Sequence, residues 1–290
     1  MSRRGWILFF TVGLLWGIPY LLIKVAVEEL SAPTIVFSRV VIGSLILIPI
    51  AIHRGSLKGA LSNMRHVFPY ALAEMVGPWI LITAAEQKIT SGLAGLLVAT
   101  VPIWSTILAS LNGDKTVWQH KRLLGMLIGF IGIVLVVGIE SVTGNNSFVA
   151  IAMILFASSL YAYAVIRVQK KIPHVDGIAI NGVAMVITAL VYLPFVIANH
   201  PATMPSAKVL ASVTALGLFP TAMAFILFFI LIKEIGPARG SLVTYLNTAF
   251  AILLGVILLG EPLTLGIALG LPLVLIGSYF ASRRPQTTSL

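Results

Sequence analysis

Ten apolar stretches, each about as long as a membrane-spanning helix, run through this chain. A bilayer core of ~30 Å needs about 20 helical residues. Stretches of that length lie at roughly 6–27, 33–52, 67–85, 91–111, 122–139, 147–166, 177–197, 208–232, 238–259 and 264–281. Hydrophobic residues make up 59% of the sequence and charged residues only 10%, which is too little charge for a water-soluble surface. The sequence therefore predicts an all-α polytopic membrane protein with ten transmembrane helices.

The second half of the chain repeats landmarks of the first half. Pro49 and Pro194 lie 145 residues apart, and the aromatic pair Trp16 and Tyr161 has the same separation, which is half of the 290 residues. A weak internal repeat in an apolar chain is typical of transporters. We therefore predict two five-helix units. Their ranges are 1–143 and 144–290.

Basic residues in the loops predict the orientation of these helices. Lys and Arg accumulate in cytoplasmic loops. With the N-terminus inside, fifteen of them fall in inner segments, and only Lys24, Lys88 and Lys208 fall at outer ones. Both termini are thus predicted to be cytoplasmic, and five helices per unit make the second unit inverted relative to the first. The same loops account for the net charge of +10, so no nucleic-acid partner is implied.

The sequence offers no cofactor or metal chemistry. It contains no cysteine, its five histidines show no metal-ligand spacing, and no phosphate-binding glycine loop is present. Arg3 and Arg4 precede a long apolar run without a convincing cleavage site, which favours a retained first helix over a signal peptide. The expected partners are a small-molecule solute and the lipid bilayer.

Glycines in the fifth and tenth helices leave the oligomeric state open. Gly125, Gly129 and Gly132, with Gly266 and Gly270, follow a small-xxx-small spacing that lets helices approach closely. This spacing serves either packing within one chain or association of two copies. The sequence does not decide between a monomer and a homodimer.

Several short motifs follow one another in a characteristic order. They are Leu15-Trp16-Gly17, Lys24, Ala32-Pro33, Arg39, the run from Ala94 to Pro102 and the turn Gly260-Glu261. In this order they resemble the ten-helix EamA-type exporters of the drug/metabolite transporter superfamily, and among these the bacterial exporters of aromatic and other neutral amino acids. The resemblance covers nearly the whole chain. It implies that helices one to four and six to nine surround a central cavity, with helices five and ten at the side.

Two residues depart from that pattern. Asp114 replaces the usual Glu in the first Gly-acid turn, and Ala249 stands where the second copy of Pro102 is expected. These departures put the exact symmetry of the fourth and ninth helices in doubt.

Three ionisable residues lie within the predicted helices, where a charge costs ~2.5–3.5 kcal/mol at the centre. Lys24 is near the outer end of its helix and can extend its ammonium to the interface. Arg39 lies deeper, where it serves either as a structural clamp on backbone groups or as a receptor for a substrate carboxylate. Glu74 is deeper still, and burial favours its neutral form. It is either a hydrogen-bonded structural residue or a proton carrier and receptor for a substrate ammonium.

Prolines and aromatic residues in mid-helix mark candidate cavity walls. The prolines that free backbone carbonyls are Pro19, Pro78, Pro102, Pro220 and Pro272. The aromatic and amide residues near these breaks are Trp16, Tyr20, Trp79, Trp104, Tyr163, Tyr245 and Asn247. The alternatives are simple kinks for the prolines, lipid contact or interface anchoring for the aromatic residues, and a helix–helix hydrogen bond for Asn247.

Together these observations predict an inner-membrane exporter of small organic solutes, most simply amino acids or similar amphipathic metabolites, that works by alternating access. An intramembrane enzyme is the first alternative, and it needs a clustered nucleophile and base, which the sequence does not show. A passive channel is the second, and it needs a continuous polar stripe, which the fifth and tenth helices lack.

Overall fold

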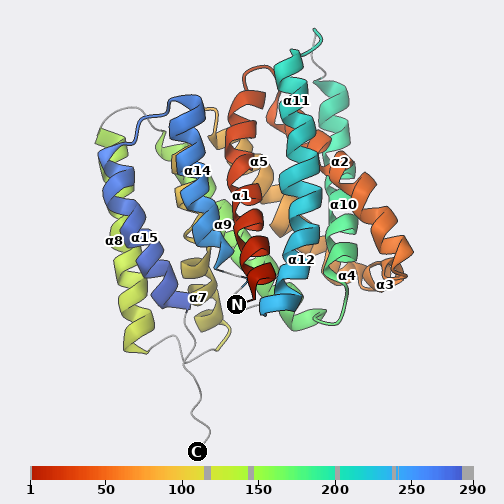
Figure 1. The fold of residues 1–290 in the computed structure, drawn as a ribbon, viewed down its shortest axis with the longest axis horizontal. Coiled ribbons are helices and arrows are strands. Elements are labelled where there is room, and N and C mark those ends of the chain that lie inside the picture. The colour runs from red at the N-terminus through yellow and green to blue at the C-terminus, as the bar shows by residue number, and fades with distance from the viewer. Residues whose placement is uncertain are drawn as a thin grey trace, which may run out of the picture.

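The structure is a computed structural model that describes residues 2–113, 119–142, 147–199, 203–236, 240 and 242–282. Within these residues the regular elements are all helical (Figure 1). They are α1 (Arg3–Ala26), α2 (Ala32–His53), α3 (Leu57–Ser62), α4 (Met64–Ala71), η1 (Leu72–Val76), α5 (Gly77–Ala85), α6 (Ser91–Val98), α7 (Val101–Leu111), α8 (His120–Val142), α9 (Phe148–Lys171), α10 (Gly177–Ala198), α11 (Ala207–Leu216), η3 (Gly217–Met223), α12 (Ala224–Ile235), α14 (Val243–Leu259) and α15 (Leu265–Ser282). The two η elements are π-helical segments.

Seven helical spans in the described residues are long and apolar enough to cross a membrane. Three shorter apolar helices belong to α8, α14 and α15. These ten pieces follow the order of the predicted segments, so the prediction of an all-α polytopic protein is confirmed. The count of ten membrane crossings stays a prediction.

Polar side chains in the turns begin several of these helices. The hydroxyl of Ser31 accepts a hydrogen bond from the backbone N–H of Thr34, and Thr90 caps α6 in the same way. The Asp176 carboxylate accepts from two backbone N–H groups of α10. Each cap satisfies donors that have no partner in the first helical turn. The predicted helix starts at 33, 91 and 177 therefore lie within one residue of the observed ones.

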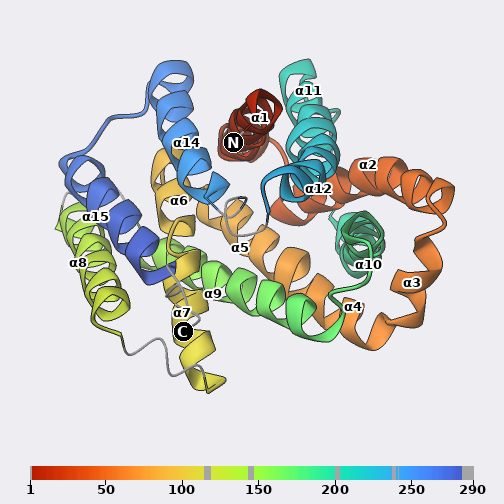
Figure 2. The ribbon, with the colours of Figure 1, turned by 60° about the horizontal axis from the view of Figure 1, so that its bottom comes forward.

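Helices α8 and α15 lie side by side at one edge of the bundle (Figures 1 and 2). Their glycines make this close approach possible, because a side chain on Gly277 would meet the backbone of Gly129. Gly132 likewise faces Val274. The small-residue spacing is thus used for packing within the chain, and self-association stays an open prediction.

Most of the other main helix contacts have an equivalent in which the two helices come from the opposite halves of the chain. Helix α1 packs against α14, as α9 packs against α6 and α7. Helix α1 also packs against α11 and α12, as α9 packs against α4 and α5. The pair α2 and α10 joins the equivalent helices of the two halves (Figure 2). This pattern is the one expected of a duplicated unit.

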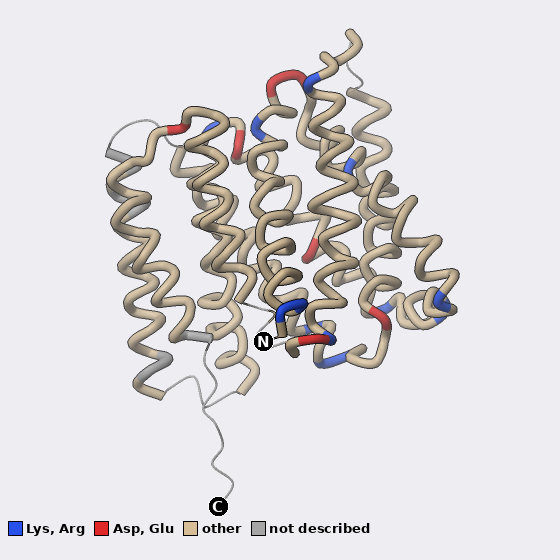
Figure 3. The backbone as a smooth tube through the Cα atoms, in the orientation of Figure 1, with Lys and Arg blue, Asp and Glu red and all other residues tan. Residues whose placement is uncertain are grey.

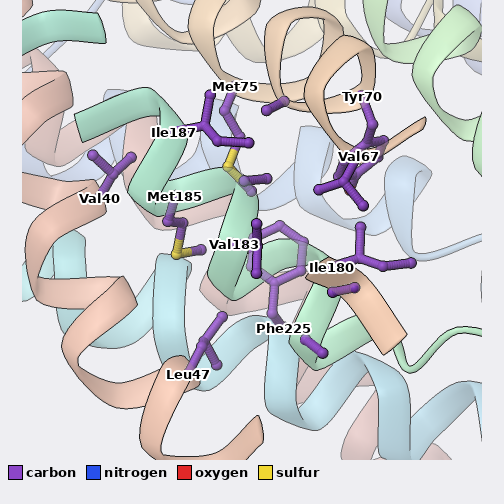
Figure 4. Close-up of a cluster of buried hydrophobic side chains, with 14 of the residues drawn as sticks. Val40, Leu47, Val67, Tyr70, Met75, Ile180, Val183, Met185, Ile187 and Phe225 are labelled. Atoms are coloured by element: carbon purple, nitrogen blue, oxygen red, sulfur yellow. The ribbon is translucent and has the colours of Figure 1, made fainter. Parts of the chain in front are cut away.

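A large buried cluster fills the space between α2, α4, α5 and α10 (Figure 4). Leu47, Met75 and Met185 are fully buried in it, and Tyr70 and Phe225 have less than a tenth of their surface exposed. Aliphatic and Met side chains pack such irregular spaces well. This cluster fixes the second and third spans of the first half against the second half.

Acidic and basic residues gather at the two ends of the bundle (Figure 3). We call the end with turns 27–31, 86–90 and 260–264 the outer end, and the end where α1 begins and α15 ends the inner end (Figure 1). That the inner end faces the cytoplasm stays a prediction from the basic residues of its loops.

Candidate substrate site

The candidate site contains a buried arginine within a predicted membrane span. Arg39 on α2 is only 7% exposed. Its Nε donates a hydrogen bond to the hydroxyl of Thr221 at 3.1 Å, and its guanidinium carbon lies 3.7 Å from the centre of the Trp79 ring. No described carboxylate lies within ion-pairing distance of it. A buried cation without a counter-ion is costly, so this group is prepared for an anionic partner.

The π-helical segment η3 positions Thr221. The hydroxyl of Thr221 donates to the carbonyl of Leu216, five residues earlier, at 2.8 Å. Its lone pair is thereby turned toward Arg39. Gly43, one turn beyond Arg39, leaves room for this contact, because a Cβ there would lie 2.8 Å from the Thr221 methyl. Single π-helical turns are frequent at functional sites, where they re-aim side chains.

Aromatic side chains form the wall around Arg39. Trp79 is 6% exposed, and its indole N–H donates to the hydroxyl of Tyr161 on α9. Tyr20 on α1 is also 6% exposed, and together with Tyr161 it lies within electrostatic reach of Arg39. The guanidinium thus faces an aromatic ring on one side and hydroxyl groups near it, a setting suited to a solute that carries both a carboxylate and an apolar body.

Glu74 lies in the other π-helical segment, η1. Its side chain is half-buried, and its Oε2 has no hydrogen-bond partner among the described residues. Tyr70 and Tyr161 both interact electrostatically with it. Since Tyr161 also interacts with Arg39, this tyrosine links the two ionisable groups. The chemistry available at Glu74 is proton exchange or contact with an ammonium.

Other predicted site residues lie in different surroundings. Trp16 packs against Phe225 and Phe228 of α12, with ring centres 5.9 Å and 4.6 Å apart. Asn247 is 7% exposed, and its Oδ1 accepts from the Thr248 hydroxyl at 3.3 Å. Trp16 thus lies in the contact between α1 and α12, and the bond of Asn247 is to the next residue of its own helix.

Three further predicted aromatic residues, Trp104, Tyr163 and Tyr245, lie in the inner halves of their predicted spans. Trp104 is half-buried on α7 and its Nε1 has no hydrogen-bond partner in the described part of the chain. Tyr245 is half-buried near the start of α14. Tyr163 is 43% exposed, and its hydroxyl accepts from Arg167 at 3.1 Å. Tyr163 therefore belongs to a basic cleft at the inner ends of α7 and α9. The cleft residues are Leu108, Asn112, Tyr163, Ile166, Arg167, Lys170 and Lys171.

Three of the five predicted prolines mark an irregular backbone. Pro78 lies in the first turn of α5, just after η1, Pro220 lies inside η3, and Pro102 lies in the first turn of α7, after a break in the fourth span. Pro19 and Pro272 lie within the unbroken helices α1 and α15.

Sequence reasoning did not select Thr221 or Tyr161 as site residues. Tyr161 had a signal, because it is the repeat counterpart of Trp16. Thr221 follows Pro220, but a π-helical turn that directs its hydroxyl to Arg39 is not readable from that neighbour alone.

Known proteins resemble this chain over nearly its full length. The sequence profile of the EamA-like transporter family matches residues 3–138 and again 148–283. An uncharacterized inner membrane transporter of Escherichia coli (strain K12), YedA, is 28% identical over 289 residues, which cover 95% of this chain and 92% of that protein. The uncharacterized transporter YoaV of Bacillus subtilis (strain 168) is 24% identical, with 93% of each chain covered.

A third relative carries a more specific name. A probable terminal-alkyne amino-acid exporter of Streptantibioticus cattleyicolor is 26% identical, with 100% of this chain and 98% of that protein covered. One solved structure with 18% sequence identity superposes with a TM-score of 0.68 over 97% of each chain, which shows a shared fold. With such relatives and its apolar helices, the chain is a multi-pass inner membrane protein.

Proposed function

Because the chain belongs to the EamA-like transporter family, we propose that it exports small organic solutes, and that its solutes are aromatic or other neutral amino acids. The observation that carries this proposal is Arg39, a buried guanidinium that has no described carboxylate partner and stacks on Trp79. The amino-acid exporter among the relatives supports the same class of solute.

Each part of an amino acid has a matching group in this site. The guanidinium of Arg39 presents several donors in one plane, which suits a carboxylate. Trp79 and Tyr161 offer aromatic surface for an apolar side chain. Glu74, with an unpartnered buried oxygen, suits the ammonium. A neutral amino acid would thus neutralise both buried groups when it binds.

Alternating access is the mechanism that the arrangement of the helices supports. The helix pairs recur when the halves are exchanged, and η1 and η3 begin at Leu72 and Gly217, which are 145 residues apart. Ten spans in two inverted units would let the halves exchange conformations around a site at their interface. The solute would bind from the inner end and leave at the outer end.

Counterflow in proteoliposomes tests this function. Vesicles loaded with unlabelled phenylalanine should transiently concentrate external radiolabelled phenylalanine, and a panel of other amino acids should compete according to their apolar side chains. A passive channel equilibrates the label without concentrating it, and an enzyme converts the solute instead of moving it. Vesicles that concentrate no member of an amino-acid panel would contradict the proposed solute class.

A further inference from the structure

The most deeply buried acid in the described chain lies at the outer end. Glu86 directly follows α5 and is 0% exposed. Neither of its carboxyl oxygens has a hydrogen-bond partner among the described residues. A charged carboxylate in such a place would pay a large desolvation cost without compensation. The geometry therefore favours a protonated Glu86.

The nearest basic residue does not neutralise this acid by an ion pair. The ammonium of Lys24 donates to the backbone carbonyls of Glu86 at 2.6 Å and of Ile89 at 2.8 Å. These bonds hold α1 against the turn at 86–90. They confirm that Lys24 reaches the outer end of its helix. The Lys24 ammonium binds these backbone carbonyls, and the two carboxyl oxygens of Glu86 have no partner among the described residues.

A second acid at the same end is fully engaged. The carboxylate of Glu261 accepts hydrogen bonds from the backbone N–H and the hydroxyl of Ser91, at 2.8 and 2.7 Å, and from the backbone N–H of Gly92 at 3.1 Å. It thereby caps the first turn of α6, where a negative charge is stabilised. Glu261 is close enough to Glu86 to repel a charge there.

The charged neighbours of Glu86 shift the pKa of its carboxyl in opposite directions. Burial raises the pKa of the Glu86 carboxyl well above its usual range, and Glu261 acts in the same direction. Lys24 and Arg39 act against them and lower this pKa. Tyr20, also near Glu86, is buried on α1. Burial is the largest influence, and it disappears if the outer end opens to water.

We propose that Glu86 is the proton-binding site of the outer end, occupied when this end is closed and vacated when it opens. On opening, the carboxylic acid releases one proton to water and becomes a carboxylate, and on closing the carboxylate takes one proton back. This inference rests on the alternating access proposed above. A closed state that holds an extra proton is favoured at low pH, and it is progressively lost as pH rises through the pKa of Glu86 in that state.

A proton fits this place better than a metal cation. Cations such as Ca²⁺ need six or more oxygen ligands. The Glu261 oxygens already accept N–H and hydroxyl donors, and the described residues contain no group of three or more His, Cys, Asp or Glu that could hold a metal.

Labelling of a single introduced cysteine tests the proposal in the full chain, which has no cysteine of its own. Ile89→Cys places a thiol at a side chain that is 2% exposed, beside the Lys24 contact. A membrane-impermeant maleimide is added to intact spheroplasts over about pH 5.5 to 8.5, a window that brackets raised carboxylate pKa values. Met204→Cys, at a site 84% exposed, corrects for the reactivity of the thiol itself and verifies the outward orientation.

The corrected labelling of the Ile89→Cys protein should rise several-fold with pH. Glu86→Gln, which keeps the shape but cannot ionise, should give low labelling at every pH. Glu28→Gln removes an exposed acid of the same end and should keep the wild-type profile. A flat profile with Glu86 intact, or a full rise in the Gln variant, overturns the proposal.

A second variant covers the case in which Glu86→Gln does not fold. Glu261→Gln keeps an acceptor for α6 but removes the negative charge near Glu86, so the rise in labelling should move to lower pH. An unmoved profile overturns the proposal. Labelling needs no solute, so a protein that exports no amino acid but shows these profiles would contradict the solute class and leave the proton site intact.

Discussion

The two halves of the chain share backbone features but differ in their chemistry. The π-helical segments begin 145 residues apart, yet η1 carries Glu74 and the position 145 residues later in η3 is Phe219, which is 46% exposed. Arg39 has the fully buried Ala184 as its counterpart, and all five tryptophans lie in the first half. The second half contributes neutral groups such as Thr221. The predicted duplication would account for the irregular backbone that the halves share, and differences between the halves at single positions place the charged residues of the candidate site in the first half.

The fourth and ninth spans differ in the backbone itself. Helix α6 ends at Val98 and α7 begins at Val101, with Pro102 in the first turn, whereas α14 runs unbroken past Ala249. The fourth and ninth helices are thus not exactly symmetric, which agrees with the doubt raised by Ala249. The other departure, Asp114, lies outside the described residues.

Hydroxyl groups from three helices stabilise the break in the fourth span. Thr248 on α14 donates to the carbonyl of Gly95 at 3.2 Å, and Ser158 on α9 donates to that of Leu97 at 3.3 Å. Ser278 on α15 donates to the carbonyl of Ala99 at 2.9 Å. A broken helix within a membrane is tolerated when such partners satisfy its backbone.

The largest expected effect comes from giving the ninth span the proline of the fourth. Ala249→Pro removes a helical hydrogen bond and introduces a clash, so the fold should lose about 3 kcal/mol of stability. Pro102→Ala is the matched change in the fourth span and should leave stability near that of the wild type or above it. Thermal unfolding of both proteins in detergent measures this difference. Equal stability of Ala249→Pro and wild type would show that the ninth span tolerates a break equally well.

A smaller effect, on solute affinity, is expected when a tryptophan of the first half is replaced. Trp79→Phe weakens the stacking on Arg39 and removes the indole donor to Tyr161, at a cost of about 0.5–2 kcal/mol, so solute affinity should fall roughly two- to thirtyfold. Trp6→Phe, at a ring that is 48% exposed, is the control and should keep the wild-type affinity. Competition in the counterflow assay gives both affinities. A similar loss in the two variants would assign these tryptophans to anchoring and not to binding.

The fold class, the order of the helices and the asymmetry of the fourth and ninth spans could be predicted from the sequence. Apolar length, repeat spacing and Ala249 in place of a proline are local signals. Arg39 and Glu74 could be selected because any charge inside a membrane helix needs a reason. The burial of Glu86 could not be predicted, because it depends on Lys24 and on a turn near Glu261, far away in the chain. The positions of the π-helical segments η1 and η3 also depend on tertiary packing, which one sequence does not reveal.

The smallest effect is expected at Glu74. Glu74→Gln preserves size and hydrogen bonding but removes one ionisable group, so it should narrow the change in counterflow rate over about pH 5.5 to 8.5 while the maximal rate stays near that of the wild type. Phe219→Leu changes the counterpart position and should leave the pH profile unchanged. An unaltered profile in Glu74→Gln would make Glu74 a structural residue and leave the pH dependence of transport to other groups.

The central claim is that Arg39 binds the carboxylate of the solute. Its most direct test is counterflow of phenylalanine and of phenethylamine, which lacks the carboxylate, in wild type, in Arg39→Gln and in Ala184→Ser as the control from the second half. A charge-assisted hydrogen bond contributes about 1.5–3 kcal/mol, so Arg39→Gln should reduce phenylalanine affinity by roughly ten- to hundredfold and leave that of the amine unchanged. Equal losses for both solutes, or full activity toward phenylalanine, would contradict the claim and make Arg39 a clamp on the helices.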